Sequence, residues 1–160
     1  MESSSKAPLQ VRDAAQADLR RILELERAAP AAAHWTEADY EIALTSAPPR
    51  LFLAVEIEQE VEGFLVARSA HTSEWEIENV VVAEARRRTG LAALLLRVFL
   101  EQVRSRKLGD GPLTIQLEVR ESNLAARRFY EKSGFRLDTR RTKYYHDPEE
   151  DALLYGLYLQ

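Results

Sequence analysis

The chain has 160 residues, about one domain's length, and its 46% hydrophobic and 30% charged residues exclude a disordered or low-complexity protein. The absence of cysteine excludes a disulfide scaffold, a cysteine-ligated zinc or iron–sulfur site and a thiol nucleophile. The 22 basic and 26 acidic residues give a formal net charge of −4, which argues against a dedicated nucleic-acid binder.

The sequence also predicts a soluble, cytoplasmic chain with no membrane partner. Its first residues lack an apolar segment, and its longest aliphatic run, Leu91–Leu96, is far too short to cross a membrane. No internal repeat or Gly/Ser-rich linker divides it, so we expect a flexible tail over residues 1–8 and a single domain over residues 9–160. The histidines lack the spacing of metal ligands, and we therefore predict no metal site.

The predicted elements of the first half are a strand, two helices and three further strands. In chain order they cover residues 11–14, 18–28, 37–45, 51–57, 61–68 and 74–82. In the last of these strands, alternation places Trp75, Ile77, Asn79 and Val81 on one face and a largely acidic set on the other.

In the second half the hydrophobic period changes from 2 to 3.6 at Gly90, which predicts a long amphipathic helix. A strand over 113–120 and a helix over 123–132 follow, and Gly134 is the expected C-terminal cap of that helix. Two last strands, near 135–144 and 152–159, complete a β-rich mixed sheet covered by helices, an α/β (α+β) class.

The turn that precedes the long helix has the composition of a phosphate-binding loop. Arg86, Arg87 and Arg88 supply charged donors, Gly90 permits close backbone approach, and the helix N-terminus favours an anion. A solvated basic turn is the alternative interpretation, and for three adjacent arginines alone it has about equal weight.

The order of these elements and two motifs resemble the GNAT acyltransferase superfamily. The motifs are Arg-Arg-x-Gly-x-Ala before the long helix and Asn-x-x-Ala-x-x-x-Tyr-x-x-x-Gly-Phe after the next strand. The resemblance implies a GNAT fold, with a mixed, mostly antiparallel sheet of about six to seven strands flanked by about four helices. It also implies acetyl-CoA as co-substrate, with its pyrophosphate bound by Arg87, Arg88, Thr89, Gly90, Leu91, Ala92 and Ala93.

Within the superfamily, later segments resemble the RimI branch, the bacterial ribosomal-protein-alanine N-acetyltransferases. These segments are Asn79–Val82, Leu117–Asn123, Tyr144-Tyr145 and the Trp35-Thr36-Glu37 triplet. Three departures stand beside them: His34 where the family usually has proline, Ala92 in place of the second loop glycine, and Ala83–Ala85 in place of an Asp-Pro stretch. The change at His34 affects the expected acceptor more than the cofactor.

The resemblance makes Glu118 the general base and Tyr130 the proton donor to the sulfur of CoA. From its strand alone, Glu118 is more simply a solvent-facing residue, and Tyr130 a packing residue near a helix end. Glu76 is a rival base, because other GNAT branches place their carboxylate at that position of the earlier strand.

The remaining site residues are expected to bind the two substrates. Backbone groups of Val80, Val81 and Val82 would meet the pantetheine arm, which requires N–H groups that the sheet leaves unpaired. Asn123 would bind the cofactor, cap the following helix, or do both. The expected acceptor-binding residues are Asn79, Trp35, Tyr144 and Tyr145, and the three aromatic residues fit a core or hairpin role equally well.

The leading hypothesis is therefore acetyl transfer from acetyl-CoA to the α-amine of a protein N-terminus. Such an amine titrates near pH ~8 and a lysine amine near ~10.4, so the N-terminus is the easier acceptor at neutral pH. The alternatives are a GNAT enzyme for a small-molecule amine or a lysine side chain, and a non-catalytic acyl-CoA-binding module.

Overall fold

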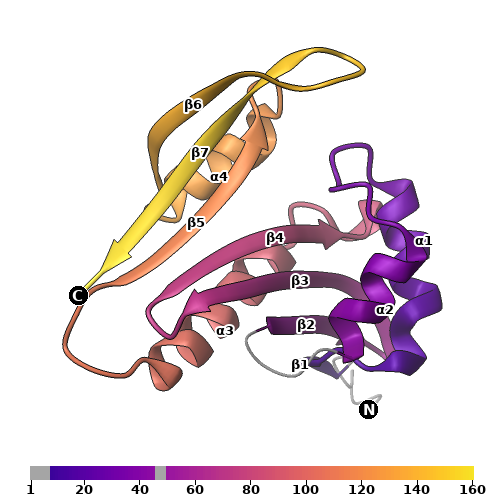
Figure 1. Ribbon diagram of the computed structural model, residues 1–160. Helices are drawn as coiled ribbons and strands as arrows, with labels where there is room; N and C mark the ends of the chain where they lie inside the picture. Colours follow the sequence, from indigo (N-terminus) through magenta and orange to yellow (C-terminus); the bar gives the residue numbers. More distant parts are fainter. Residues whose placement is uncertain (1–7, 46–49) are drawn as a thin grey trace. The chain divides into compact units, whose positions relative to one another are not determined.

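A computed structural model describes residues 8–45 and 50–160 of the chain (Figure 1). Of the predicted N-terminal tail, all but Pro8 lies outside the described residues. Contacts within the chain divide it into two compact units. The first unit is Met1–Val66 with Asn79–Glu101, and the second is Ala67–Glu78 with Gln102–Gln160. The single domain expected over 9–160 stays a prediction, and each unit is described by itself.

The described residues form seven strands and four α-helices, with two short 3-10 helices labelled η. The strands are hydrogen-bonded in the order β1-β2-β3-β4-β5-β7-β6. In chain order the elements are β1 (Leu9–Asp13), η1 (Gln16–Asp18), α1 (Leu19–Ala28), α2 (Glu37–Thr45), β2 (Arg50–Ile57), β3 (Glu60–His71), β4 (Glu74–Val82), η2 (Glu84–Arg86), α3 (Leu91–Arg106), β5 (Leu113–Arg120), α4 (Leu124–Lys132), β6 (Arg136–Tyr145) and β7 (Glu150–Leu159).

The core of the first unit lies between strands and the helices α1 and α2. Ile22 from α1, Tyr40 from α2, Phe52 from β2 and Phe64 from β3 are almost fully buried in one cluster. The alternate residues of β2 are buried as well, and Figure 1 shows α3 behind these strands, on the side away from α2. Strands covered on both faces carry near-continuous hydrophobic runs, as β2 and β3 do.

The second unit has one covered face and one polar face. β5 pairs antiparallel with β7 from Leu113–Leu159 to Arg120–Ala152, and β6 pairs antiparallel with the other edge of β7. Leu113, Ile115 and Leu117 are buried, whereas the alternate side chains of β5 stay at least partly exposed. Figure 1 shows α4 against one side of these strands. The polar face of β5 is the one that carries Glu118.

The C-terminus of α4 is capped as the sequence predicts, by Gly134. Gly134 has φ +98°, its N–H donates to Glu131 O (3.1 Å), and the N–H of Phe135 donates to Tyr130 O (3.0 Å). This pair of hydrogen bonds is a Schellman motif, which needs a left-handed residue where glycine carries no steric penalty. The motif packs the Phe135 ring against that of Tyr130, with centroids 5.4 Å apart.

The predicted α/β class and the predicted order of elements are confirmed. The strand predicted over 74–82 has the bounds of β4, and Trp75, Ile77, Asn79 and Val81 are its buried residues. The sequence patterns did not show η1 and η2, because three-residue helices are too short to display a hydrophobic period. No helix among the described residues is long and apolar enough to cross a membrane.

Candidate active site

In the first unit, the N-terminus of α3 forms the predicted anion-binding loop. The N–H of Leu94 donates to Gly90 O (3.0 Å), so the N–H groups of Leu91, Ala92 and Ala93 precede the first intrahelical bond. Gly90 has φ +87°, and a Cβ added there would meet nothing within 4 Å. An open loop with unpaired amides at a helix N-terminus has the properties that a pyrophosphate requires.

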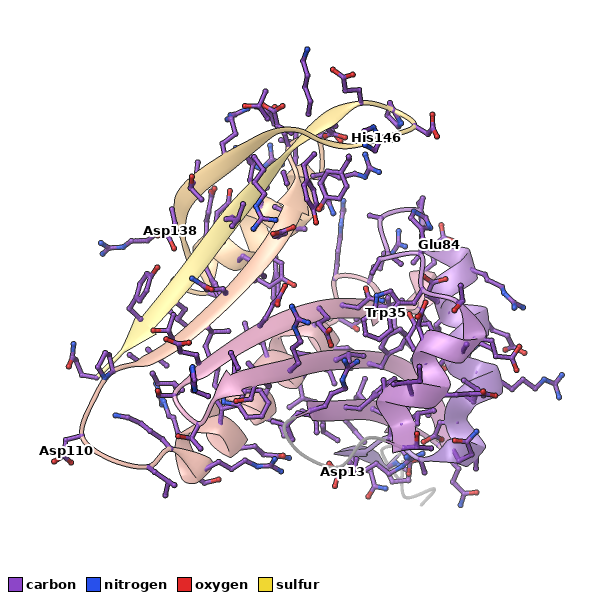
Figure 2. The ribbon with its side chains drawn as sticks, in the orientation of Figure 1. Asp13, Trp35, Glu84, Asp110, Asp138 and His146 are labelled. Carbon is purple, nitrogen blue, oxygen red and sulfur yellow. The ribbon has the colours of Figure 1, made fainter. Side chains whose placement is uncertain are left out.

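The three arginines of this loop face different surroundings. Arg86 lies 3.9 Å from a carboxylate oxygen of Glu62. Arg87 lines a cavity of about 330 Å³ together with Glu84 of η2, which is labelled in Figure 2, and residues of α1. Arg88 adopts φ +62°, a left-handed conformation that non-glycine residues rarely occupy. Strain of this kind concentrates at functional sites, and here it lies in the predicted phosphate loop.

The ladder between β4 and β5 stops before the residues of β4 that we expect to meet the pantetheine arm. The ladder between β4 and β5 begins at the Glu74–Thr114 pair and ends at the Ile77–Leu117 pair, before it reaches Val80. The N–H groups of Val80, Val81 and Val82 are therefore not committed to β5. In the same stretch the Asn79 amide is buried and donates to the Tyr40 hydroxyl (2.9 Å), so Asn79 is a structural residue of the first unit.

The segment that carries Trp35 is fixed by a buried carboxylate. The N–H of Trp35 donates to Glu26 Oε1 (2.9 Å), and Glu26 is 5% exposed at the end of α1. The Trp35 ring lies 5.1 Å from that of Tyr40, and the Arg50 guanidinium lies over it at 5.6 Å (Figure 2). Trp35 is only partly buried, so it packs against the core and still presents surface.

His34 shows that the departure from the family's proline changes the backbone. Its φ is +58°, whereas a proline ring fixes φ near −65°. A proline at this position would require a different path of the chain into Trp35. The segment expected to border the acceptor therefore has its own conformation in this protein.

In the second unit, Glu118 forms an ion pair that the sequence did not indicate. Its Oε1 lies 3.1 Å from Arg141 Nη1, and its side chain is 22% exposed. β7 separates β5 from β6, and the register places Ala152 directly opposite Arg141 and two residues from Leu154, the partner of Glu118. The small side chain of Ala152 leaves room for the arginine to reach across β7.

Tyr144 and Tyr145 lie beside this pair, and their role in acceptor binding stays a prediction. The Arg141 guanidinium lies 5.3 Å from the Tyr144 ring centroid, and the Arg120 guanidinium lies 4.2 Å from that of Tyr145. Burial raises the pKa of Tyr145, and the negative charge of Glu118 raises it further. Tyr145 and Glu118 are thus close enough to interact electrostatically.

A β-bulge in β6 accounts for the arrangement of the two tyrosines. Consecutive strand residues normally point to opposite faces, yet their ring centroids are only 5.2 Å apart. The register shifts between Arg141 and Tyr145, and Lys143 inside the shift has φ +54°. Asp151 secures the bulge by accepting from Lys143 N (2.8 Å). Bulges are known to redirect side chains next to active sites.

Tyr130 lies in α4 and is buried, with only 7% of its surface exposed. Burial raises the pKa of its hydroxyl well above the usual value near 10, so it keeps its proton throughout the physiological range. Asn123 caps the same helix by accepting from Ala126 N (3.3 Å), which confirms its capping role. Its contact with the cofactor stays a prediction.

The rival base, Glu76, pairs with a different arginine of the second unit. Its Oε2 accepts from Arg68 Nη2 (2.7 Å) and Arg68 Nε (2.9 Å), and its side chain is 40% exposed. Glu118 is less exposed than Glu76 and lies beside two aromatic residues. The local surroundings therefore favour Glu118.

Comparison with known proteins places this site in a family. A model described as the acetyltransferase (GNAT) family matches residues 16–135, which is most of the chain. The chain belongs to the GNAT acetyltransferase family. Among curated relatives of this GNAT chain, the ribosomal protein bS18-alanine N-acetyltransferase of Haemophilus ducreyi is 37% identical over 84 residues, which are 51% of this chain and 55% of the relative. The chain thus spans about half the length of the curated relatives it matches.

Solved GNAT structures are similar over nearly the whole chain. The ribosomal-protein-S18-alanine N-acetyltransferase of Escherichia coli has a TM-score of 0.81 at 25% identity, over 96% of this chain and 95% of that one. Ard1 of Thermoplasma volcanium has a TM-score of 0.83 at 25% identity, over 95% and 98% of the two chains. The GNAT resemblance seen in the sequence motifs is confirmed, and so is the predicted similarity to the RimI branch.

The sequence analysis did not single out three residues that contact the predicted site residues. Arg141 contacts Glu118 and Tyr144, Arg120 contacts Tyr145, and Glu26 accepts from the N–H of Trp35. No local pattern marks them, because each acts through a partner that the fold supplies.

Proposed function

We propose that this GNAT protein transfers the acetyl group of acetyl-CoA to the α-amine of a protein N-terminus. The observation that carries the proposal is the cluster of Glu118, Tyr144 and Tyr145 on the open face of the second unit. It combines a proton acceptor with aromatic surface suited to a peptide. The names of the curated relative and of the Escherichia coli structure, both alanine N-acetyltransferases of a ribosomal protein, support the same acceptor class.

The residues that would hold acetyl-CoA fit its chemistry. The free amides at the start of α3, with Arg87 and Arg88, suit a pyrophosphate, and the edge of Val80–Val82 beyond the β5 ladder suits the amide-bearing pantetheine arm. When bound, acetyl-CoA supplies a thioester carbonyl as the electrophile and a thiol as the leaving group. Asn123 adds a polar side chain that we expect to bind the same arm.

We assign the two proton transfers to Glu118 and Tyr130. Glu118 accepts a proton from the attacking amine, directly or through water, as the new C–N bond forms. Tyr130 donates its hydroxyl proton to the sulfur as the C–S bond breaks, and Glu118 then returns its proton through solvent to the phenolate. Burial raises the pKa of Tyr130, so the hydroxyl keeps this proton until the departing sulfur takes it.

Trp35, Tyr144 and Tyr145 would bind the acceptor peptide, with Asn79 acting through the Tyr40 hydrogen bond that fixes its strand. A ribosomal protein is the narrower candidate for this acceptor, and it would place the reaction in the cytoplasm. The unusual backbone at His34 favours one alternative, an acceptor other than that of the relatives. The acceptor panel below distinguishes a protein N-terminus from a lysine side chain and from a small amine.

Calorimetry with acetyl-CoA followed by thiol-release assays tests the proposal. Three kinds of acceptor are compared. The first is a peptide with a free N-terminus and one internal lysine, the second is that peptide with its N-terminus blocked, and the third is a panel of small amines. We expect acetyl-CoA binding and turnover with the free N-terminus alone. Binding without turnover on any acceptor would instead indicate a non-catalytic acyl-CoA-binding module.

Glu118→Gln tests the base, and Glu76→Gln is its matched comparison. We expect Glu118→Gln to lower kcat about 10²-fold, the lower end for removal of a general base, without weakening acetyl-CoA binding. Glu76→Gln should leave kcat close to that of the unchanged protein. The reverse pattern would assign the base to Glu76.

A further inference from the structure

The ion pair between Glu118 and Arg141 raises the question of which form of the amine the site accepts. A protein N-terminus titrates near pH ~8, so at neutral pH about nine tenths of it is an ammonium ion. The ammonium has no lone pair and cannot attack a thioester. An isolated carboxylate would nevertheless attract it more strongly than the reactive neutral amine.

Arg141 removes that preference, because its guanidinium lies 3.1 Å from the carboxylate oxygen. A neighbouring charge is paired as well, because Arg120, two residues further along the same face of β5, lies 3.3 Å from Glu150. Glu118 therefore lies between a guanidinium that already pairs with it and the rings of Tyr144 and Tyr145, and it attracts an incoming cation less than an isolated carboxylate would.

We propose that Arg141 is a specificity-determining residue that makes the acceptor site select the neutral amine over the ammonium ion. The guanidinium of Arg141 occupies the place beside Glu118 that an ammonium ion would take, and it already balances the negative charge there. The neutral amine has no charge to lose on leaving water, so it enters at less cost, and Glu118 remains free to accept its proton as the C–N bond forms. The inference rests on the proposed function and adds the form in which the acceptor binds.

The position of Arg141 supports a role in selection over a role in stability. Its side chain is 52% exposed, and exposed ion pairs contribute little to folding. It also lies over the Tyr144 ring, which orients the guanidinium above the same surface. The two ends of the contact come from β5 and β6, so the bulged edge strand supplies the selecting charge to the strand that carries the base.

The test measures charge selection directly with two capped peptides of one sequence. A trimethylglycyl cap carries a permanent positive charge, and a tert-butylacetyl cap is its neutral isostere. Neither can be acetylated, so calorimetric binding in the presence of CoA compares charge at nearly constant shape. For the unchanged protein we expect the neutral peptide to bind at least as tightly as the cationic one.

Arg141→Gln should favour the cationic peptide over its isostere by about two- to five-fold, the range expected for loss of an exposed ion pair. With the free N-terminal peptide, the same variant should lower both KM and kcat, because ammonium ions then occupy the site unproductively. Arg141→Lys should restore the original behaviour. Arg140→Gln is the matched control, since this neighbouring arginine pairs with Asp151 and Glu121 and should leave the ratio unchanged.

An unchanged ratio in Arg141→Gln, with a normal thermal midpoint, would overturn the inference while acetyl transfer by the unchanged protein still supports the proposed function. A protein that acetylates no free N-terminus would overturn both. A shift that Arg140→Gln reproduces would show a general effect of surface charge and would also overturn the role of Arg141.

Discussion

Glu26 and Glu118, one in each unit, show two opposite uses of a carboxylate. Glu26 is 5% exposed and accepts a backbone N–H from Trp35, whereas Glu118 is 22% exposed at its side chain and faces a guanidinium that is itself half-exposed. A buried acceptor with a backbone donor fixes the path of the chain, because the unpaired donor would be costly. A partly exposed carboxylate with a half-exposed partner is more accessible to a substrate. We therefore expect Glu26 to serve the structure and Glu118 to serve the chemistry.

The largest effect that we expect is a loss of kcat when the proposed proton donor is removed. Tyr130→Phe removes the proposed proton donor but keeps the ring that packs against Phe129 and Phe135. We expect kcat to fall about 10²-fold, with little change in thermal midpoint or acetyl-CoA binding. Because the pKa of Tyr130 is raised, the unchanged protein should show no loss of rate from its ionisation below about pH 10. Steady-state kinetics from pH 6 to about 10 check both statements, and equal rates for the two proteins would remove Tyr130 from the mechanism.

The next largest effect is a loss of stability when the buried carboxylate of Glu26 is removed. Glu26→Ala leaves the Trp35 N–H without its acceptor, and we expect a loss of about 2 kcal/mol in the free energy of unfolding. Glu24→Ala, on the same helix but with a 49% exposed side chain, should cost less than about 0.5 kcal/mol. Urea unfolding measures both, and the KM for the acceptor peptide should rise in Glu26→Ala alone. Similar costs for the two variants would mean that Glu26 does not fix the segment.

The smallest effect concerns an ion pair of the first unit, between Arg12 and Asp18, and the pH dependence of stability that it causes. Arg12 donates to both oxygens of Asp18 (2.8 and 2.9 Å), and this lowers the pKa of Asp18 in the folded protein. A lowered pKa stabilises the fold above the unfolded value of about 3.9, and this stabilisation disappears as the pH falls through the folded value. Asp18→Asn should therefore be less stable by under about 1 kcal/mol at pH 7, with a flatter loss of stability below pH ~4.

Unfolding free energies measured between pH 2 and about 7 test this expectation, and Asp13→Asn, exposed on the neighbouring strand, is the control. If Asp18→Asn kept the same acid slope as the unchanged protein, the Arg12 pair would not contribute to the pH dependence. The ion pairs of the first unit would then be as weakly coupled to folding as we expect the Glu118–Arg141 pair to be.

Local patterns predicted much of the fold and of the site. The helical period from Gly90, the alternation in 74–82 and the cap at Gly134 each depend on residues a few positions apart, and each is present in the structure. The roles of Glu118 and Tyr130 came instead from the resemblance to GNAT motifs, and they stay predictions. Hydrophobic periodicity and capping act through sequence neighbours, so the sequence by itself determined them.

The partners of these residues were decided only by the tertiary structure. Arg141 reaches Glu118 because β7 lies between β5 and β6 and places small Ala152 at the crossing point. The bulge that brings Tyr144 and Tyr145 together depends on Asp151 from the paired strand. Strand order and register are set by the packing of the whole sheet, and no local propensity encodes which distant side chains will meet.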